Sequence, residues 1–425
     1  MCACETPLYI FHVLCVRCVR MIFNLKKIYI VGVGLGADTL TPEARDAISR
    51  ADVLLGAEKI IAEYREKRSF PYYLPKDVAA CIECEDAETF AALVSGDVGF
   101  YSAAAGLCEA LRAYDLRFIP GISTVNAFFA RLKIPWQDAA FISAHGRELH
   151  GGAVNVVDTV RRNRLTFCLT GNNIKEIGAI LRKAGFSQIK THIGENLGSE
   201  QERVYEASAE ALSRDEFPSM TALLFVNEAF DGRTPCGLAD DSFSRLPGIP
   251  MTKSETRAVV MSKLNLRPES VCWDVGAGTG SVTVEMAFSS FRGHVYAVER
   301  REDAIPLIEQ NCTAFHVGNV TAVCGEAPAA LETLPPPDAA FIGGSGGELG
   351  EIIAVALRKN AAARIVLTAA TIETVSAALS AFGKSGLEPE IVTINTARSK
   401  PAGRLHMMEA QNPVTIISAG GFTVL

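Results

Sequence analysis

The sequence has 425 residues, a net charge of -7 and 48% hydrophobic residues, values typical of a globular protein with two or three domains. They exclude a disordered or collagen-like chain, and 41 basic against 48 acidic residues argue against a general nucleic-acid binder. The mean hydropathy of +0.19 prompts a search for membrane spans. The apolar stretch at 8–23 is interrupted by His12, Arg17 and Arg20, so we expect neither a membrane span nor a signal peptide. We therefore expect a cytoplasmic location.

Twelve cysteines are scattered along the chain. Cys15 and Cys18 have the spacing of half a zinc site, but no second pair follows at ligand spacing. We therefore expect that the thiols are reduced and that the chain has no metal site. Residues 1–25 are treated as an extension of uncertain order.

Strand-like apolar runs alternate with helical stretches, which predicts an α/β fold. The first series begins with a strand at Lys27–Val33 and ends with a strand at Thr221–Val226, so it predicts a domain over residues 26–230. Residues 231–249 are rich in Gly, Pro, Asp and Ser and are interpreted as a linker.

A second α/β series occupies residues 250–425 and predicts another domain. It opens with a predicted helix in which Thr252 is the N-cap of a capping box with Glu255. Its last two predicted strands, Glu390–Asn395 and Val414–Ser418, have no helix between them. These two strands are expected to form an antiparallel pair at the edge of the sheet.

A glycine-rich turn, GAGTG, follows the predicted strand Val271–Val275. Its glycines allow the backbone to approach a ligand closely. Glu299 ends the next strand, where an acid accepts hydrogen bonds from ribose hydroxyls. A dinucleotide requires the third glycine one residue later and disfavours Asp274 beside its pyrophosphate, whereas a carboxylate near a sulfonium is favourable. The turn therefore favours S-adenosylmethionine, with a nicotinamide cofactor as the alternative.

Further motifs accompany this turn in order: PMTKSETR at 250–257, GEAP at 325–328, FIGGSGGEL at 341–349 and QNPVT at 411–415. Together they resemble the decarboxylating methyltransferase domain of cobalamin biosynthesis, which has a Rossmann-like class I methyltransferase fold. The resemblance implies cofactor contacts at Thr252, Gly276, Ala277, Gly278, Thr279, Gly280, Glu299 and Ala327. The GGSGG segment suits the close approach of a large flat ligand, so the expected substrate contacts there are Gly344, Ser345 and Gly346.

The first domain has its own glycine turn, IVGVGLG at 30–36, but no acid ends a well-formed second strand. SGDVGFYS at 95–102, PGIST at 120–124 and SAHGR at 143–147 follow it. This series resembles the tetrapyrrole methylase family, whose two-lobed α/β fold holds S-adenosylmethionine, although Val98 stands where the family often has proline. The expected cofactor contacts are Gly32, Gly34, Gly36, Gly96, Asp97, Ser123 and Thr124.

In this order the two domains resemble two-domain methyltransferases of corrin-ring synthesis. The resemblance implies methylation of precorrin-6B, or its cobalt form, at ring carbons 5 and 15, with loss of carbon dioxide from the acetate on ring carbon 12, giving precorrin-8. By the same resemblance the first domain acts at carbon 5 and the second at carbon 15, with one S-adenosylmethionine in each. A homo-oligomer is expected, with no nucleic-acid or membrane partner.

The acceptor carbon is already electron-rich, so it needs alignment with the methyl group more than a strong base. Glu326 or His406 is the hypothesised proton donor in decarboxylation, and Asp97 is the polar candidate of the first domain. Carboxylates on the substrate predict basic contacts, among which Arg147, Arg398 and Arg404 are preferred. The other candidates are Arg131, Lys133, Lys253 and Lys400.

Three other functions stay open at this point. The second domain is alternatively an RNA or protein methyltransferase with the first as an accessory domain, but the acidic balance and the lack of an N/D-P-P-Y-like motif disfavour this. A non-catalytic cofactor-binding scaffold of the pathway is a further alternative, disfavoured by the intact glycines of both turns. A nicotinamide-dependent reductase is the third.

Overall fold

The computed structural model describes residues 26–146, 149 and 155–421. These residues form two compact units. The first contains the described chain up to Asp138 together with Ile193–Tyr205 and Met220–Ala222, and the second contains the rest. Helices and strands alternate throughout, so the predicted α/β fold is confirmed.

Several predicted features lie outside the described residues, namely the 1–25 extension with Cys15 and Cys18, and Arg147. Within the described ranges, no helix has the length and apolar character needed to cross a membrane.

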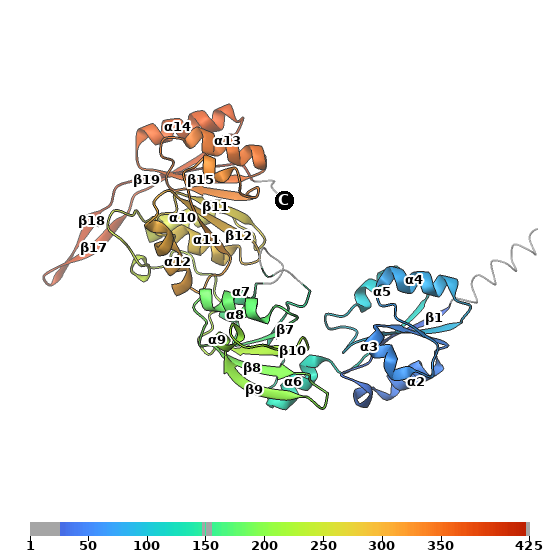
Figure 1. The fold of residues 1–425 in the computed structure, drawn as a ribbon. Coiled ribbons are helices and arrows are strands. Elements are labelled where there is room, and N and C mark those ends of the chain that lie inside the picture. The colour runs from blue at the N-terminus through green and yellow to red at the C-terminus, as the bar shows by residue number, and fades with distance from the viewer. Residues whose placement is uncertain (1–25, 147–148, 150–154, 422–425) are drawn as a thin grey trace, which may run out of the picture. The chain divides into compact units, whose positions relative to one another are not determined.

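The first unit is built on a parallel sheet with the strand order β3-β2-β4-β1-β5. Helices pack on both faces of this sheet, α2 on one and α4 and α5 on the other (Figure 1). Burial on both faces explains why the inner strands β1, β2 and β4 are nearly continuous apolar runs. The strands are β1 (Lys27–Gly32), β2 (Val53–Gly56), β3 (Ser69–Phe70), β4 (Thr89–Val94) and β5 (Asp115–Ile119), and the helices are α2 (Pro42–Arg50), α3 (Glu58–Ile61), α4 (Pro75–Cys84) and α5 (Ala104–Ala110).

A second five-stranded sheet has the order β6-β7-β10-β8-β9. Short apolar runs predict four of its five strands, whereas the half-exposed β9 is not predicted. The strands are β6 (Ala140–Ser143), β7 (Leu165–Leu169), β8 (Lys190–Glu195), β9 (Arg203–Ser208) and β10 (Thr221–Val226), and the helices of this region are α6 (Thr124–Leu132), α7 (Val156–Arg162), α8 (Ile174–Lys183) and α9 (Ala209–Leu212).

The C-terminal sheet has seven strands in the order β13-β12-β11-β14-β15-β19-β16. Helices α10, α11 and α12 cover one face and α13 and α14 the other (Figure 1). The predicted antiparallel pair is confirmed, because β19 pairs antiparallel with β16, which is the edge strand. The strands are β11 (Val271–Val275), β12 (His294–Glu299), β13 (Val320–Cys324), β14 (Ala339–Ile342), β15 (Arg364–Ala369), β16 (Glu390–Ile394) and β19 (Val414–Ala419), and the helices are α10 (Ser254–Leu264), α11 (Ser281–Ser289), α12 (Ala304–Ala314), α13 (Leu349–Lys359) and α14 (Ile372–Lys384).

The capping box predicted at the start of α10 is wrong. The N-cap position belongs to Lys253 rather than Thr252, and the Lys253 side chain makes no cap. Instead, Asp240 Oδ1 accepts a hydrogen bond from the backbone N–H of Ser254 at 3.0 Å. A carboxylate from the preceding segment therefore satisfies the exposed end of α10, where a negative charge also complements the helix dipole.

In two segments beside the C-terminal sheet, the structure differs from the prediction. The predicted linker packs on the domain, because Phe243 is buried in the same apolar core as α10 and α11. Between β16 and β19 the chain forms a hairpin of β17 (Ala397–Ala402) and β18 (Leu405–Ala410), which projects from the domain with exposed side chains (Figure 1).

Candidate functional site

The glycine turn after β11 is held between two other backbone segments. A Cβ atom at Gly276 would lie 2.7 Å from the backbone nitrogen of Gly344, and one at Gly278 would lie 2.4 Å from the carbonyl oxygen of Pro250. Both glycines have positive φ angles, 74° and 56°. The Gly276 N–H also donates to the carbonyl of Val298 at 2.9 Å, which fastens the turn to the end of β12. Only glycine satisfies these close approaches.

Glu299, predicted as the ribose acid, ends β12 beside this turn. Its Oε2 accepts a hydrogen bond from the N–H of Gly278 at 3.0 Å, and its Oε1 accepts one from the N–H of Arg301 at 3.1 Å. The two bonds orient the carboxylate. Because a carboxylate offers about four acceptor sites, capacity remains for the two hydroxyls of a ribose.

A pocket of ≈ 270 Å³ opens beside Glu299, and seven of the expected site residues of the second domain meet there. Its lining includes the predicted residues Gly276, Glu299, Glu326, Ala327, Gly344, Ser345 and Gly346. The side chains of Ala277 and Thr279 are buried below the turn, and Gly280 is the N-cap of α11. Thr252 instead lines a neighbouring pocket.

Asp274 lies fully buried at the end of β11, below the glycine turn. The Thr283 hydroxyl donates to its Oδ2 at 2.5 Å, but its Oδ1 has no hydrogen-bond partner among the described residues, nor has the buried hydroxyl of Thr279. Burial raises the pKa of Asp274 to about 7, opposed by the Thr283 hydrogen bond, and the charge of Glu299 adds to the rise. Buried oxygens without a hydrogen-bond partner, below a glycine turn, are more compatible with a cationic cofactor such as S-adenosylmethionine than with an anionic pyrophosphate.

The two predicted proton donors do not meet in one pocket. Glu326 lines the pocket of Glu299, where its exposed carboxylate lies 3.7 Å from the guanidinium of Arg300. His406 belongs to β18, and both His406 and Arg404 are exposed on the hairpin. Neither of these two residues lines the Glu299 pocket or its neighbour.

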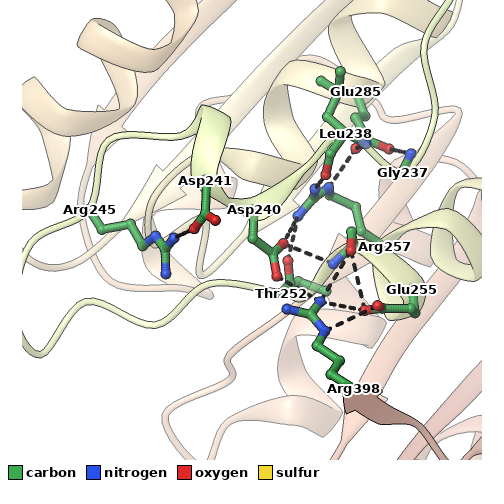
Figure 2. Close-up of polar contacts among 11 residues, drawn as sticks. Gly237, Leu238, Asp240, Asp241, Arg245, Thr252, Glu255, Arg257, Glu285 and Arg398 are labelled. Carbon is green, nitrogen blue, oxygen red and sulfur yellow. Dashed lines mark hydrogen bonds and ion pairs between the residues drawn. The ribbon is translucent and has the colours of Figure 1, made fainter. Parts of the chain in front are cut away.

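Arg398, a predicted substrate contact, is engaged by acids of its own domain (Figure 2). Its Nη2 lies 2.8 Å from Asp240 Oδ2 and 2.5 Å from Glu255 Oε2. These hydrogen bonds raise the pKa of the Arg398 guanidinium. Arg398 therefore links the base of the hairpin to the start of α10. This role could not be predicted because Arg398 is far from Asp240 and Glu255 along the chain.

Three glycines meet where β1, β4 and β5 of the first unit end. A Cβ atom at Gly121 would lie 2.2 Å from the carbonyl oxygen of Gly96 and 2.6 Å from that of Gly32. Gly34 forms a backbone bridge with Gly96. Asp97 Oδ2 accepts a hydrogen bond from the N–H of Gly121 at 3.1 Å, so Asp97 holds this glycine cluster together. Gly121 was not among the predicted contacts, although the PGIST motif contains it.

The other predicted residues of the first unit surround this cluster. Gly36 precedes a short 3-10 turn at Ala37–Thr39. Ser123 caps α6 by accepting a hydrogen bond from the N–H of Asn126 at 3.2 Å, and Thr124 is the first residue of that helix. The turn residues and the helix start thus lie at one edge of the sheet, where ligands of open α/β sheets bind.

Two regions of the chain match family models. Residues 27–213 match the model described as tetrapyrrole (corrin/porphyrin) methylases. Residues 247–420 match the model described as the precorrin methyltransferase domain. Each matched region contains one of the two glycine turns.

Named relatives cover one region or both. The chain is 44% identical over 185 residues to a probable cobalt-precorrin-6B C(15)-methyltransferase (decarboxylating) of Pyrobaculum calidifontis, an alignment that covers 43% of this chain and 95% of the relative. It is 28% identical over 401 residues to a precorrin-6Y C(5,15)-methyltransferase [decarboxylating] of a Sinorhizobium species, covering 91% of this chain and 94% of the relative. A crystal structure titled precorrin-6y C5,15-methyltransferase from Geobacter metallireducens is 39% identical, with a TM-score of 0.42, over 44% of this chain and 97% of that chain.

Proposed function

The chain belongs to the precorrin methyltransferase family, and from this premise we propose that it methylates precorrin-6B or its cobalt form at ring carbons 5 and 15. The same proposal includes loss of carbon dioxide from the acetate on ring carbon 12, giving precorrin-8. One observation carries the proposal: Glu299, oriented by two backbone N–H groups, faces a pocket beside a glycine turn with the orphaned carboxylate Asp274 below it. This arrangement suits a ligand with a ribose and a cation.

S-adenosylmethionine supplies a methyl group activated by its sulfonium. Glu299 would bind the ribose, the backbone of Gly276–Gly278 would lie against the cofactor, and Asp274 would balance its positive charge from below. The chain then contributes mainly position, because an electron-rich ring carbon reacts once it is aligned with the methyl group and water is excluded. This role agrees with a site that lacks an obvious nucleophile and base pair among the residues lining it.

We assign methylation at carbon 5 to the first domain and methylation at carbon 15 with decarboxylation to the second. The relative from Pyrobaculum, which aligns with only 43% of this chain, is named for carbon 15, whereas the Sinorhizobium relative aligns with 91% and is named for both carbons. The separate glycine cluster at Gly32, Gly96 and Gly121 supports a second cofactor site, hence one S-adenosylmethionine in each domain.

In the decarboxylation the bond between the carboxyl carbon and the acetate methylene breaks. Its electron pair enters the conjugated macrocycle, and a proton restores the methyl group. Glu326 remains the better placed of the two predicted donors, because it lines the pocket beside Glu299 whereas His406 lies on the exposed hairpin.

Mass spectrometry of precorrin-6B incubated with the full chain and S-adenosylmethionine tests the function. We expect a gain of two methyl groups and a loss of one carbon dioxide. Binding of S-adenosylmethionine without turnover of the tetrapyrrole would instead favour the scaffold alternative. Light scattering after size-exclusion chromatography tests the expected homo-oligomer separately.

A further inference from the structure

Two pockets of the second domain share one wall. The pocket that contains Glu299 and a second pocket of ≈ 440 Å³ are both lined by Pro250 and by Gly343, Gly344 and Ser345. The second pocket continues along the start of α10, the end of β15 and the start of α14. Its volume is within the range of small-molecule sites. A group bound in it therefore lies across one short loop from the cofactor pocket.

The second pocket differs from the first in charge. Among the described residues that line it, Lys253 is the one charged residue and none is acidic. The first pocket, by contrast, contains the acids Glu299 and Glu326 together with Arg300 and Arg301. The rest of the second lining is apolar or hydroxylated, with Met251, Ile342, Leu349, Leu367 and Val414 as apolar members and Thr252, Thr256, Ser345, Thr368, Thr371 and Thr374 as hydroxylated ones.

The acids closest to Lys253 along the chain are each bound by an arginine, Asp241 by Arg245. Asp240 and Glu255 are both bound by Arg398 (Figure 2). Lys253 itself is exposed at the N-cap position of α10, at the mouth of the second pocket. Because burial of a carboxylate requires a compensating charge or donor, an acid-free pocket with one ammonium and several hydroxyls suits an anionic organic ligand.

We propose that the second pocket is the acceptor site of the domain and that Lys253 binds a carboxylate of the tetrapyrrole there. The apolar residues would contact the flat ring system, and the hydroxyls would bind the remaining polar groups. This inference rests on the proposed function and adds to it the residue that selects an acidic acceptor. Of the six nominated basic residues that the structure describes, Lys253 is the one that lines this pocket.

Lysine labelling tests the site without requiring turnover. The full chain is treated with an amine-reactive reagent, with and without uroporphyrin III, a stable tetrapyrrole octacarboxylate, and labelling is followed for each peptide by mass spectrometry. We expect saturating uroporphyrin III to slow the labelling of Lys253 at least fivefold and to leave Lys384, at the end of α14, unchanged. Equal labelling rates at Lys253 with and without uroporphyrin III would overturn the proposal.

Variant kinetics give a second test with an internal control. For Lys253→Met we expect the KM of the acceptor for carbon-15 methylation to rise about tenfold, since a hydrogen bond to a charged group contributes about 1.5 kcal/mol or more. Lys253→Arg should restore part of this loss, whereas carbon-5 methylation and the affinity for S-adenosylmethionine stay unchanged. An unchanged KM, or a loss confined to cofactor affinity, would contradict the proposal.

If the wild-type chain forms no carbon-15 product while Lys253 is still protected from labelling, the proposed function fails and the acceptor pocket stands.

Discussion

Arg257 and Glu285 form an ion pair in which neither side chain is exposed, with Arg257 Nε 2.5 Å from Glu285 Oε1 (Figure 2). Glu285 also accepts hydrogen bonds from the N–H groups of Gly237 and Leu238, both at 2.9 Å. Arg257 donates to the carbonyl of Thr252 at 2.5 Å. The pair therefore fastens the segment before α10 to the core and fixes the backbone that forms one side of the acceptor pocket.

Arg257→Met should destabilise the second domain by about 3–5 kcal/mol, because it leaves the carboxylate of Glu285 buried without its partner. Urea unfolding followed by the fluorescence of the buried Trp273, in a Trp136→Phe background, measures this domain selectively. The exposed Arg267→Met is the matched control and should change stability by less than about 0.5 kcal/mol.

Adding Glu285→Leu to Arg257→Met provides a sharper test of the pair. The double variant should lose less stability than the sum of the single variants, since two coupled charges disappear together. It should remain less stable than the wild type, because the N–H groups of Gly237 and Leu238 lose their acceptor. Strictly additive losses would show that the two side chains are not coupled.

The strands and glycine turns could be predicted from the sequence because their causes are local. Apolar runs bounded by turn residues predicted β10 and β11 with their observed limits, and the spacing from the glycine turn to Glu299 predicted an acid beside that turn. The cap of α10 was mispredicted, because the oxygen that binds Ser254 comes from Asp240 rather than from the adjacent Thr252.

The basic residues of the site were harder to predict, because a sequence does not show which basic side chains are already paired with acidic ones. Arg398 meets Asp240 only after a chain separation of 158 residues, and Arg131 is similarly bound by Glu202. Lys253 was among the four less preferred of seven candidates until the fold placed it at an acid-free pocket. The hairpin of β17 and β18 was missed because its exposed strands lack a regular alternation of apolar and polar residues.

Glu299→Gln should weaken S-adenosylmethionine binding at the second domain by about 10- to 100-fold, since hydrogen bonds to a charged group contribute about 1.5–3 kcal/mol. Calorimetry on the full chain should show one tight site in place of two. Glu302→Gln, an exposed neighbour, is the control and should retain both sites. Two undiminished sites in Glu299→Gln would remove Glu299 from the cofactor pocket.

Gly121→Ala should abolish carbon-5 methylation while carbon-15 methylation continues. The added Cβ atom would lie 2.2 Å from the carbonyl oxygen of Gly96, so the glycine cluster must separate. Mass spectrometry of the products should show one added methyl group and the loss of carbon dioxide. Gly383→Ala, in α14 with open space around its Cβ position, should leave both methylations intact. Continued carbon-5 methylation by Gly121→Ala would exclude the cluster as the first cofactor site.

Stability of the second domain should fall with rising pH because of Asp274, whose pKa burial raises to about 7 from an ordinary value of 3.8. Between about pH 4 and 7 the native carboxyl keeps a proton that the unfolded chain releases, so the free energy of unfolding decreases across this window and is level above it. Asp274→Asn should remove the decrease. Urea unfolding at pH 5 and pH 8, followed by Trp273 fluorescence, measures the difference, and the same slope in both proteins would contradict the assignment.

Cofactor binding should couple to the same proton. A bound sulfonium favours the ionised form of Asp274, so it lowers the raised pKa and binding releases a proton near pH 7. The affinity for S-adenosylmethionine should consequently increase from pH 6 to pH 8. Calorimetry in phosphate and Tris buffers, on a Gly121→Ala background to isolate the second domain, should give binding enthalpies that differ by the buffer ionisation enthalpy. Adding Asp274→Asn should make the enthalpies equal, whereas a persistent difference would assign the released proton to another group.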